Sequence, residues 1–168
     1  MAKKVLLLSG PGGSGKTTIA ELLVKKRGFI LVDGDNLDTE FFPHGEQWLP
    51  KNTEKLARAH DKILREARKL FDADHSVVVD YIIFGRYLEF IDKFRKEFGD
   101  NFEMKILFPS KEEIVKRDKK RECWTTGEER IAAVRSEFEA IKNKIGLQNF
   151  LDTSGQTPEM TFENHFAL

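Results

Sequence analysis

The residues that most clearly suggest chemistry lie near the start of the chain, where Gly10 to Thr17 read G-P-G-G-S-G-K-T. The pattern G-x-x-x-x-G-K-[S/T] is typical of a phosphate-binding loop when a strand precedes it and a helix follows it. Its glycines let backbone N–H groups surround a phosphate, and the N-terminal end of the helix attracts the same anion. We expect a nucleoside triphosphate to contact Gly10, Gly12, Gly13, Ser14, Gly15, Lys16, Thr17 and Thr18.

Two side chains of this loop have specific expected roles. Lys16 is expected to bridge the β- and γ-phosphates, and Thr17 to ligate Mg²⁺, so ATP and Mg²⁺ are the predicted cofactors. The alternative is a glycine-rich turn that binds nothing. The apolar run Val5–Leu8 before the loop and the helix-forming run Ile19–Lys26 after it favour the phosphate-binding interpretation.

Acidic residues follow two later apolar runs. The apolar run 29–32 is followed by Asp33-Gly34-Asp35-Asn36, and Asp80 ends the apolar run 76–80. Ligands of open parallel sheets bind beyond the carboxyl ends of the strands, so these carboxylates should face the γ-phosphate. We expect Asp35 to take the proton of an acceptor hydroxyl, Asp33 to hold Mg²⁺-bound water or orient the loop, and Asp80 to reach Mg²⁺ through water. A solvated turn at 33–36 and a helix cap at Asp80 remain alternatives.

The segment Lys116 to Arg121 carries five positive charges and one negative charge. On a helix beside the phosphates, such residues can neutralise developing charge and open again for product release. Arg117 and Arg121 are the expected phosphate contacts, because a planar guanidinium fits phosphate oxygens better than an ammonium group does. A solvated helix face is an equally good interpretation of this run.

The segment 33–46 contains five acidic residues and no Lys or Arg. This local charge favours a neutral or cationic acceptor, although Arg58 and Arg86 are candidates to reach the site and reverse that preference. Together with Asp35 and Tyr81, these two arginines are the predicted acceptor contacts.

Short apolar runs alternate with helical patterns along the whole chain. Such alternation is typical of an α/β fold with a parallel sheet and helices on both faces. The clearest helix covers about 53–71, helices are expected to begin after the capping boxes at Ser110 and Thr126, and 122–125 should break the helical pattern. Thr157-Pro158 is typical of a helix start. Strands are expected at 5–8, 29–32, 76–80, 102–108 and 149–152.

Composition narrows the class further. The chain has 168 residues, with 28 Lys and Arg against 28 Asp and Glu, which fits one domain covering 1–168 and argues against a general nucleic-acid-binding surface. One cysteine and four histidines without metal-ligand spacing exclude an internal disulfide and a zinc site. No apolar run suits a signal peptide or membrane span, so a cytoplasmic protein without a membrane partner is expected.

The absence of two motifs argues against two other classes of P-loop protein. No Asn-Lys-x-Asp segment of guanine-specific switch proteins occurs, and Asp80 is followed by Tyr81 rather than by the glutamate with which large motor ATPases activate water. Phosphoryl transfer to an acceptor other than water remains.

The Gly10–Thr17 loop, Asp33-Gly34-Asp35-Asn36 and the later Arg117-Asp118-x-Lys120 resemble the small P-loop kinases, which include adenylylsulfate, gluconate and shikimate kinases and the chloramphenicol phosphotransferase group. The resemblance implies a P-loop NTPase three-layer sandwich, with the P-loop strand in the middle of a five-stranded parallel sheet and a mobile lid over ATP, here at about 116–127. It also implies that Asp35 activates the acceptor, that an arginine of 117–121 closes onto the nucleotide, and that 152–158 borders the adenine. Leu37-Asp38 stand where two of these groups place their arginine or histidine, so the usual acceptor groups of adenylylsulfate and gluconate kinases are absent.

The predicted function is therefore ATP-dependent phosphorylation of a hydroxyl on a small molecule such as a polyol, nucleoside or antibiotic-like compound. Two alternatives stay open. A polynucleotide 5′-hydroxyl kinase shares these motifs but normally needs a basic track for the nucleic-acid backbone. A regulatory module would bind the nucleotide without acceptor chemistry.

Overall fold

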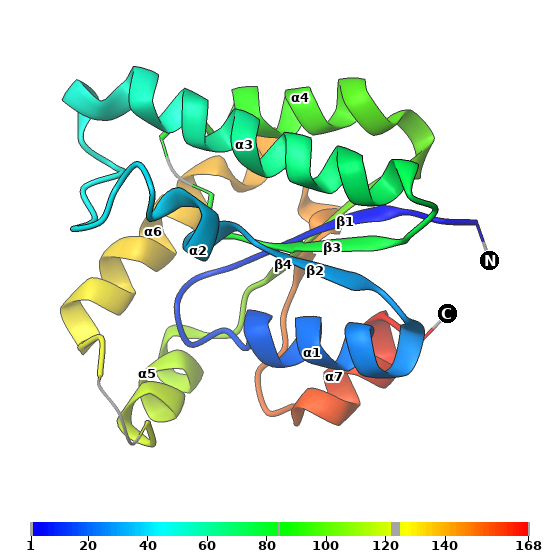
Figure 1. Ribbon diagram of the computed structural model, residues 1–168. Helices are drawn as coiled ribbons and strands as arrows, with labels where there is room; N and C mark the ends of the chain where they lie inside the picture. Colours follow the sequence, from blue (N-terminus) through cyan, green and yellow to red (C-terminus); the bar gives the residue numbers. More distant parts are fainter. Residues whose placement is uncertain (1, 84, 122–124, 168) are drawn as a thin grey trace.

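The computed structural model describes residues 2–83, 85–121 and 125–167. A parallel sheet in the order β2-β3-β1-β4-β5 forms its centre, with helices on both faces (Figure 1). The phosphate-loop strand β1 is therefore the middle strand, and the predicted α/β class, five-stranded parallel sheet and strand alternation are confirmed. The strands are β1 (Val5–Ser9), β2 (Ile30–Asp33), β3 (Val77–Asp80), β4 (Phe102–Leu107) and β5 (Phe150–Leu151).

Seven α-helices are assigned within the described part of the chain. They are α1 (Lys16–Arg27), α2 (Gly34–Asp38), α3 (Thr53–Asp72), α4 (Tyr87–Phe98), α5 (Lys111–Lys119), α6 (Glu128–Ile145) and α7 (Pro158–His165). Short 3-10 turns cover Pro50–Asn52, Gly99–Asn101 and Leu147–Asn149. None of the helices in the described ranges is long and apolar enough to cross a membrane.

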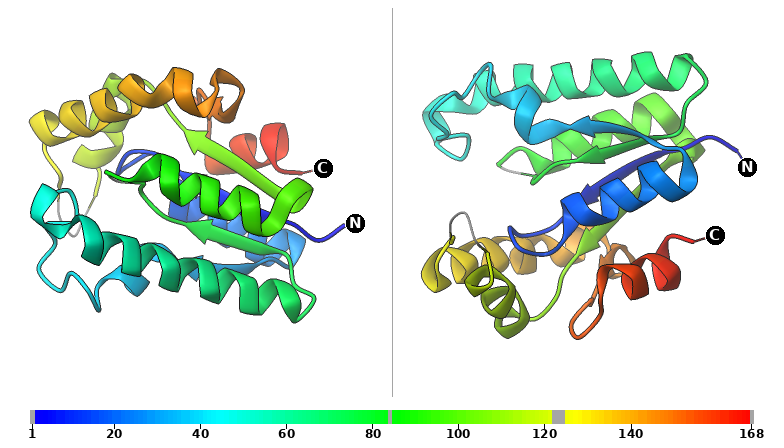
Figure 2. Two further views of the ribbon diagram at one scale, coloured as in Figure 1. Left: turned by 90° about the horizontal axis from the view of Figure 1, so that it is seen from above. Right: turned by 60° about the horizontal axis from the view of Figure 1, so that its bottom comes forward.

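The two helical layers bury different faces of the sheet. Residues of α3, α4 and α6 pack on one face, and residues of α1 and α7 pack on the other (Figure 2). The predicted apolar stripe of α3 is confirmed, since Leu56, Ile63, Ala67 and Phe71 all lie in the core. All five residues of β1 are buried, because a central strand is covered on both faces.

The three predicted helices all begin within two residues of the expected positions, and two of them carry the expected side-chain cap. Ser110 accepts a hydrogen bond from the Glu113 N–H, and Thr157 accepts one from the Met160 N–H. The capping box at Thr126 was a wrong prediction, because α6 begins at Glu128 and its N-cap, Gly127, makes no side-chain cap. A carboxylate from α5 instead accepts hydrogen bonds from the N–H groups of Thr126 and Gly127, just before α6, as described below. The predicted break at 122–125 lies mostly outside the described residues.

Candidate active site

The phosphate loop is held in shape by glycines and by Lys16. Gly13 and Gly15 have φ angles of 82° and 95°, in the left-handed region that favours glycine. Gly10 is also confined, because a Cβ there would lie 2.4 Å from the Leu107 carbonyl oxygen. The Lys16 ammonium donates to the carbonyl oxygens of Gly10 at 2.9 Å and Pro11 at 3.4 Å. Burial lowers the pKa of this lysine, while Asp80 and Asp35 act in the opposite direction.

Thr17 and Asp80 meet at the edge of the sheet, next to this loop. The Thr17 hydroxyl donates to Asp80 Oδ2 at 3.0 Å, whereas the buried Oδ1 has no hydrogen-bond partner within the described ranges. The buried Ser14 hydroxyl is likewise without a partner there. Buried polar atoms are normally satisfied, so these two oxygens fit a site completed by a ligand. A hydroxyl beside a carboxylate suits Mg²⁺, which usually takes one or two protein ligands together with substrate phosphates.

No group of three or more His, Cys, Asp or Glu suited to a metal ion occurs within the described part of the chain. The Thr17 and Asp80 pair therefore fits an ion shared with a nucleotide rather than an ion held by a protein cage.

Asp35 lies across the same pocket from the phosphate loop. The pocket is lined by Gly12, Gly13, Gly15, Lys16, Thr17, Thr18, Asp35, Ile82, Arg117 and Arg121. Asp35 is exposed to the pocket, and partial loss of water around it raises its pKa to about 6, against the opposing charge of Lys16. The nearby carboxylates of Asp38, Asp80 and Asp33 act in the same direction as the loss of water. Asp35 thus combines a place opposite Lys16 with a pKa close to neutral, which suits a general base.

Asp33 orients the segment that carries Asp35. Its carboxylate accepts a hydrogen bond from the Asn36 N–H at 3.0 Å and caps α2, while the residue itself is exposed. Of the two roles expected for Asp33, the geometry shows the orientation of the loop.

A buried support lies beneath Asp35 and was not foreseen. The Asp38 carboxylate is buried and accepts hydrogen bonds from the Tyr81 hydroxyl at 3.1 Å and the Gln47 amide at 3.4 Å. Gly34 is required by the same packing, because a Cβ there would lie 2.6 Å from the Tyr81 ring. Tyr81, a predicted acceptor contact, has no exposed surface and supports α2 from the core.

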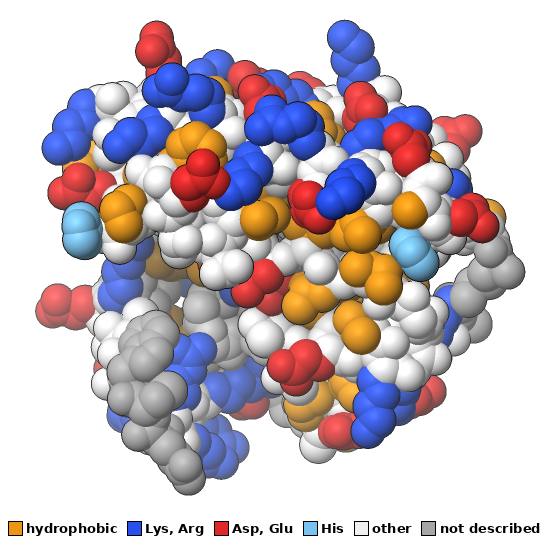
Figure 3. Space-filling model, in the orientation of Figure 1, with side chains coloured by type: hydrophobic (Ala, Val, Ile, Leu, Met, Phe, Trp, Pro, Cys, Tyr) orange, Lys and Arg blue, Asp and Glu red, His pale blue; other side chains and the backbone are white. Residues whose placement is uncertain are grey.

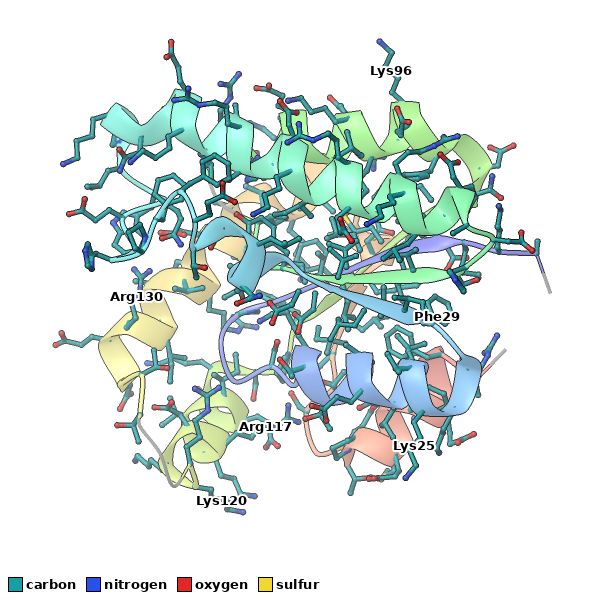
Figure 4. The ribbon with its side chains drawn as sticks, in the orientation of Figure 1. Lys25, Phe29, Lys96, Arg117, Lys120 and Arg130 are labelled. Carbon is teal, nitrogen blue, oxygen red and sulfur yellow. The ribbon has the colours of Figure 1, made fainter. Side chains whose placement is uncertain are left out.

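Arg117 connects α5 to the phosphate loop and to the segment after β5. Its guanidinium donates to the Ser14 carbonyl at 3.2 Å and to the Thr153 carbonyl at 3.1 Å, while its Nε donates to Glu113 at 3.1 Å. Figure 4 shows this side chain reaching from α5 toward the start of α1. Arg121 lines the phosphate side of the pocket and lies 3.8 Å from the Asp118 carboxylate. The structure therefore places both predicted arginines at the phosphate loop.

Asp118 ties the basic helix to α6. Its buried carboxylate accepts hydrogen bonds from the Thr126 N–H at 2.8 Å and the Gly127 N–H at 3.0 Å, and these bonds hold its pKa below the usual range. Sequence reasoning missed this role because the acidic residue was read as the exception in a basic run. No local pattern pointed to this role, because the N–H groups that it binds lie eight and nine residues further along the chain.

A second pocket continues from Arg117 toward α7. Its lining includes the apolar Ile19 and Leu107 and the polar Thr153, Gln156 and Thr161. The segment 152–158, expected to border the adenine, supplies part of this lining. Gly15, Thr18 and Arg117 line both pockets, so an apolar cleft sized for a base is continuous with the phosphate loop.

The two arginines predicted to contact the acceptor, Arg58 and Arg86, lie outside the lining of the phosphate pocket. Arg58 is exposed on α3, and Arg86 forms an ion pair with Glu89 of α4. Neither is among the residues that line the phosphate pocket. Figure 3 shows the hollow between α5 and the helices above it, with Lys and Arg side chains along its edge.

A protein family described as "AAA domain" matches residues 5–146, from β1 to the end of α6. The chain belongs to this family. The match covers the phosphate loop, Asp35, Asp80 and the arginines of α5, so this AAA-domain protein has its proposed chemistry within the family region. No curated protein matches it by sequence.

Solved structures with a fold similar to this AAA-domain protein include two kinases and a chain of an RNA repair complex. A sugar kinase from Janibacter sp. HTCC2649 is 20% identical, with a TM-score of 0.75 over 97% of this chain and 92% of the other. A gluconokinase from Sinorhizobium meliloti 1021 is 18% identical, with a TM-score of 0.62 over 95% and 88%. A chain of an RNA repair complex is 20% identical, with a TM-score of 0.62 over 84% of this chain and 46% of that chain. At these identities the likeness shows the fold, which is that of the small P-loop kinases.

Proposed function

We propose that this protein transfers the γ-phosphoryl group of Mg-ATP to a hydroxyl of a small molecule. The observation that carries the proposal is the position of Asp35 opposite Lys16 in one pocket, with Thr17 and Asp80 beside them. A purely regulatory nucleotide site has no need for a carboxylate with a raised pKa beside the phosphate loop. The sugar kinase and gluconokinase folds support the same reaction class.

Three groups of residues in the pocket have different roles in the proposed transfer. The glycine loop and Lys16 bind the triphosphate, and Arg117 and Arg121 offset the charge that develops on the transferred group. Thr17 and Asp80 are the residues that would hold Mg²⁺, which supplies further neutralisation of phosphate charge when bound. Residues 116–127 would act as the lid of a single domain.

Asp35 serves as the general base in this scheme. The acceptor oxygen forms its bond to the γ-phosphorus as the bond to the β,γ-bridging oxygen breaks, and the proton of the hydroxyl passes to the Asp35 carboxylate. ADP and the phosphate ester leave, and the proton returns to water. The Asp33 cap and the Asp38–Tyr81 hydrogen bond keep the carboxylate aimed into the pocket.

The test is ADP release from Mg-ATP in the presence of separate polyols, nucleosides, amino-sugars and aromatic alcohols, with mass detection of the phosphorylated product. We expect at least one alcohol to stimulate ADP release and to gain one phosphoryl group. Stimulation by none of them, with ATP binding intact, would favour a regulatory nucleotide-binding module.

A polynucleotide 5′-hydroxyl kinase is the second candidate, and one surface favours it. A groove along α5 is lined by four lysines, Lys111, Lys116, Lys119 and Lys120, together with Val115 and two acidic residues, Glu112 and Glu128. The similar fold within an RNA repair complex points the same way. A short oligonucleotide with a 5′-hydroxyl belongs in the same panel. If these lysines bind the phosphates of the oligonucleotide backbone, kcat/KM for its phosphorylation should fall steeply as salt is added.

A further inference from the structure

An apolar pocket adjoins the proposed site for phosphoryl transfer. It has a volume of about 310 Å³ and lies among the segment before α3, the exit of β3 and the helix α6. The residues that matter here are Trp48, Ile83, Tyr87, Phe138, Ile141 and Glu137. A volume of this size suits one ring with a short side chain.

The pocket is connected to Asp35 through two elements. Ile82 lines the phosphate pocket and its chain neighbour Ile83 lines the apolar pocket, so the exit of β3 borders both. On the other side, Gln47 is hydrogen-bonded to the Asp38 carboxylate of α2 and directly precedes Trp48. The general base and the wall of the apolar pocket are therefore carried by a common support.

Trp48 also contacts the first turn of α6. The Arg130 guanidinium of α6 lies 5.1 Å from the centre of the Trp48 ring, and Figure 4 shows Arg130 pointing from α6 toward the segment that carries Trp48. Trp48 is half exposed, at 50% of its surface, which is unusual for so large a ring unless a partner covers it.

We propose, on the basis of the proposed function, that this pocket binds the body of the acceptor, and that the acceptor is an alcohol with an apolar, preferably aromatic, body that is neutral or cationic. Most of the side chains named above are apolar, so a polyol would lose water from hydroxyls that the wall leaves unmatched. Glu137 is the one charged side chain among the described lining residues, and it favours an amine over a carboxylate or phosphate. The acidic segment 33–46 adds to this preference.

Three alcohols with one skeleton test the charge preference. They are 2-amino-1-phenylethanol, 1-phenyl-1,2-ethanediol and mandelate, which are cationic, neutral and anionic; sorbitol serves as a neutral polyol. We expect kcat/KM to fall in the order cation, neutral, anion, and to be about tenfold lower for sorbitol than for the neutral aromatic diol. Glu137→Gln should reduce the ratio of cation to anion by about fivefold. Glu139→Gln, on the same helix but outside the pocket lining, should leave the ratio unchanged.

Tryptophan fluorescence separates this inference from the proposed function. The chain has two tryptophans, so a Trp124→Phe background leaves Trp48 as the reporter. We expect 2-amino-1-phenylethanol to quench this emission, also when Asp35→Asn removes transfer, and Trp48→Ala to weaken phosphorylation of the aromatic alcohols selectively.

Quenching without phosphorylation of any alcohol would support the pocket and contradict the proposed function. Preferred phosphorylation of sorbitol or mandelate, with Trp48 emission unchanged by the aromatic amine, would overturn the inference and leave the proposed function standing. Unchanged emission with all three aromatic alcohols would also overturn it.

Discussion

His60 should make the folded protein sensitive to mild acid. This residue of α3 is 2% exposed, packs against the rings of Tyr81 and Phe90, and has no hydrogen-bond partner for Nε2 within the described residues. Burial lowers its pKa from 6.5 to about 4, with Lys93 and Arg86 adding to the shift and Glu89 and Asp61 opposing it. The unfolded chain therefore takes up a proton at a higher pH than the folded protein does, and stability is lost as the pH falls from 6.5 toward 4.

The size of the effect follows from the two pKa values. At pH 5 nearly all unfolded chains carry the proton and few folded molecules do, so His60 costs about 2 kcal/mol of unfolding free energy relative to pH 7. The assay is urea denaturation of the wild type and His60→Leu at both pH values. The loss between pH 7 and pH 5 should be about 2 kcal/mol smaller in His60→Leu.

Carboxylates with raised pKa values, such as Asp35 and Asp38, change stability in the opposite direction, but they contribute equally to both proteins and cancel in the difference. His75→Leu, on the exposed turn after α3, is the matched control and should behave as the wild type. An equal loss in His60→Leu and wild type would refute the reasoning.

Three further predictions concern the site. Gly34→Ala should destabilise the fold by about 1–3 kcal/mol in urea denaturation, because the new Cβ would lie 2.6 Å from the buried Tyr81 ring. It should also lower the rate of transfer about 100-fold, because it displaces Asp35. A variant as stable as the wild type would contradict this prediction. Lys16→Ala should weaken ATP binding about 100-fold by calorimetry, and unchanged affinity would exclude the assigned phosphate contact. Asp118→Asn should raise KM for ATP several-fold and speed hydrogen exchange of the Thr126 and Gly127 amides. If these amides exchange as slowly as in the wild type, the link between α5 and α6 does not depend on this carboxylate.

The fold could be predicted from the sequence because its signals are local. The short apolar runs, the amphipathic period of α3 and the caps at Ser110 and Thr157 each need only a few neighbouring residues, and the structure has these elements close to the expected places. The hydrogen bonds at the start of α6 could not be predicted in the same way. The N–H groups of Thr126 and Gly127, just before this helix, donate to Asp118, which lies eight and nine residues upstream on another helix.

The phosphate side of the site was predictable for a similar reason. Its loop is continuous in sequence, and the residues after β2 and β3 must meet at one edge of a parallel sheet. The acceptor side depends on contacts between distant segments. Tyr81 follows a strand as a binding residue would, yet the Gly34 backbone and the Asp38 carboxylate cover it. Arg86 was expected to reach the site, and its guanidinium forms an ion pair with Glu89, one turn further along the chain.

Transfer by Asp35→Asn protein tests the account most directly, measured as phosphorylated product beside the ATP dissociation constant. If Asp35 is the general base, the variant should bind ATP within about twofold of the wild type and transfer about 10²–10⁴-fold more slowly. Glu40→Gln removes a charge from the same acidic segment and should transfer at the wild-type rate. Transfer by Asp35→Asn at the wild-type rate would contradict the central claim.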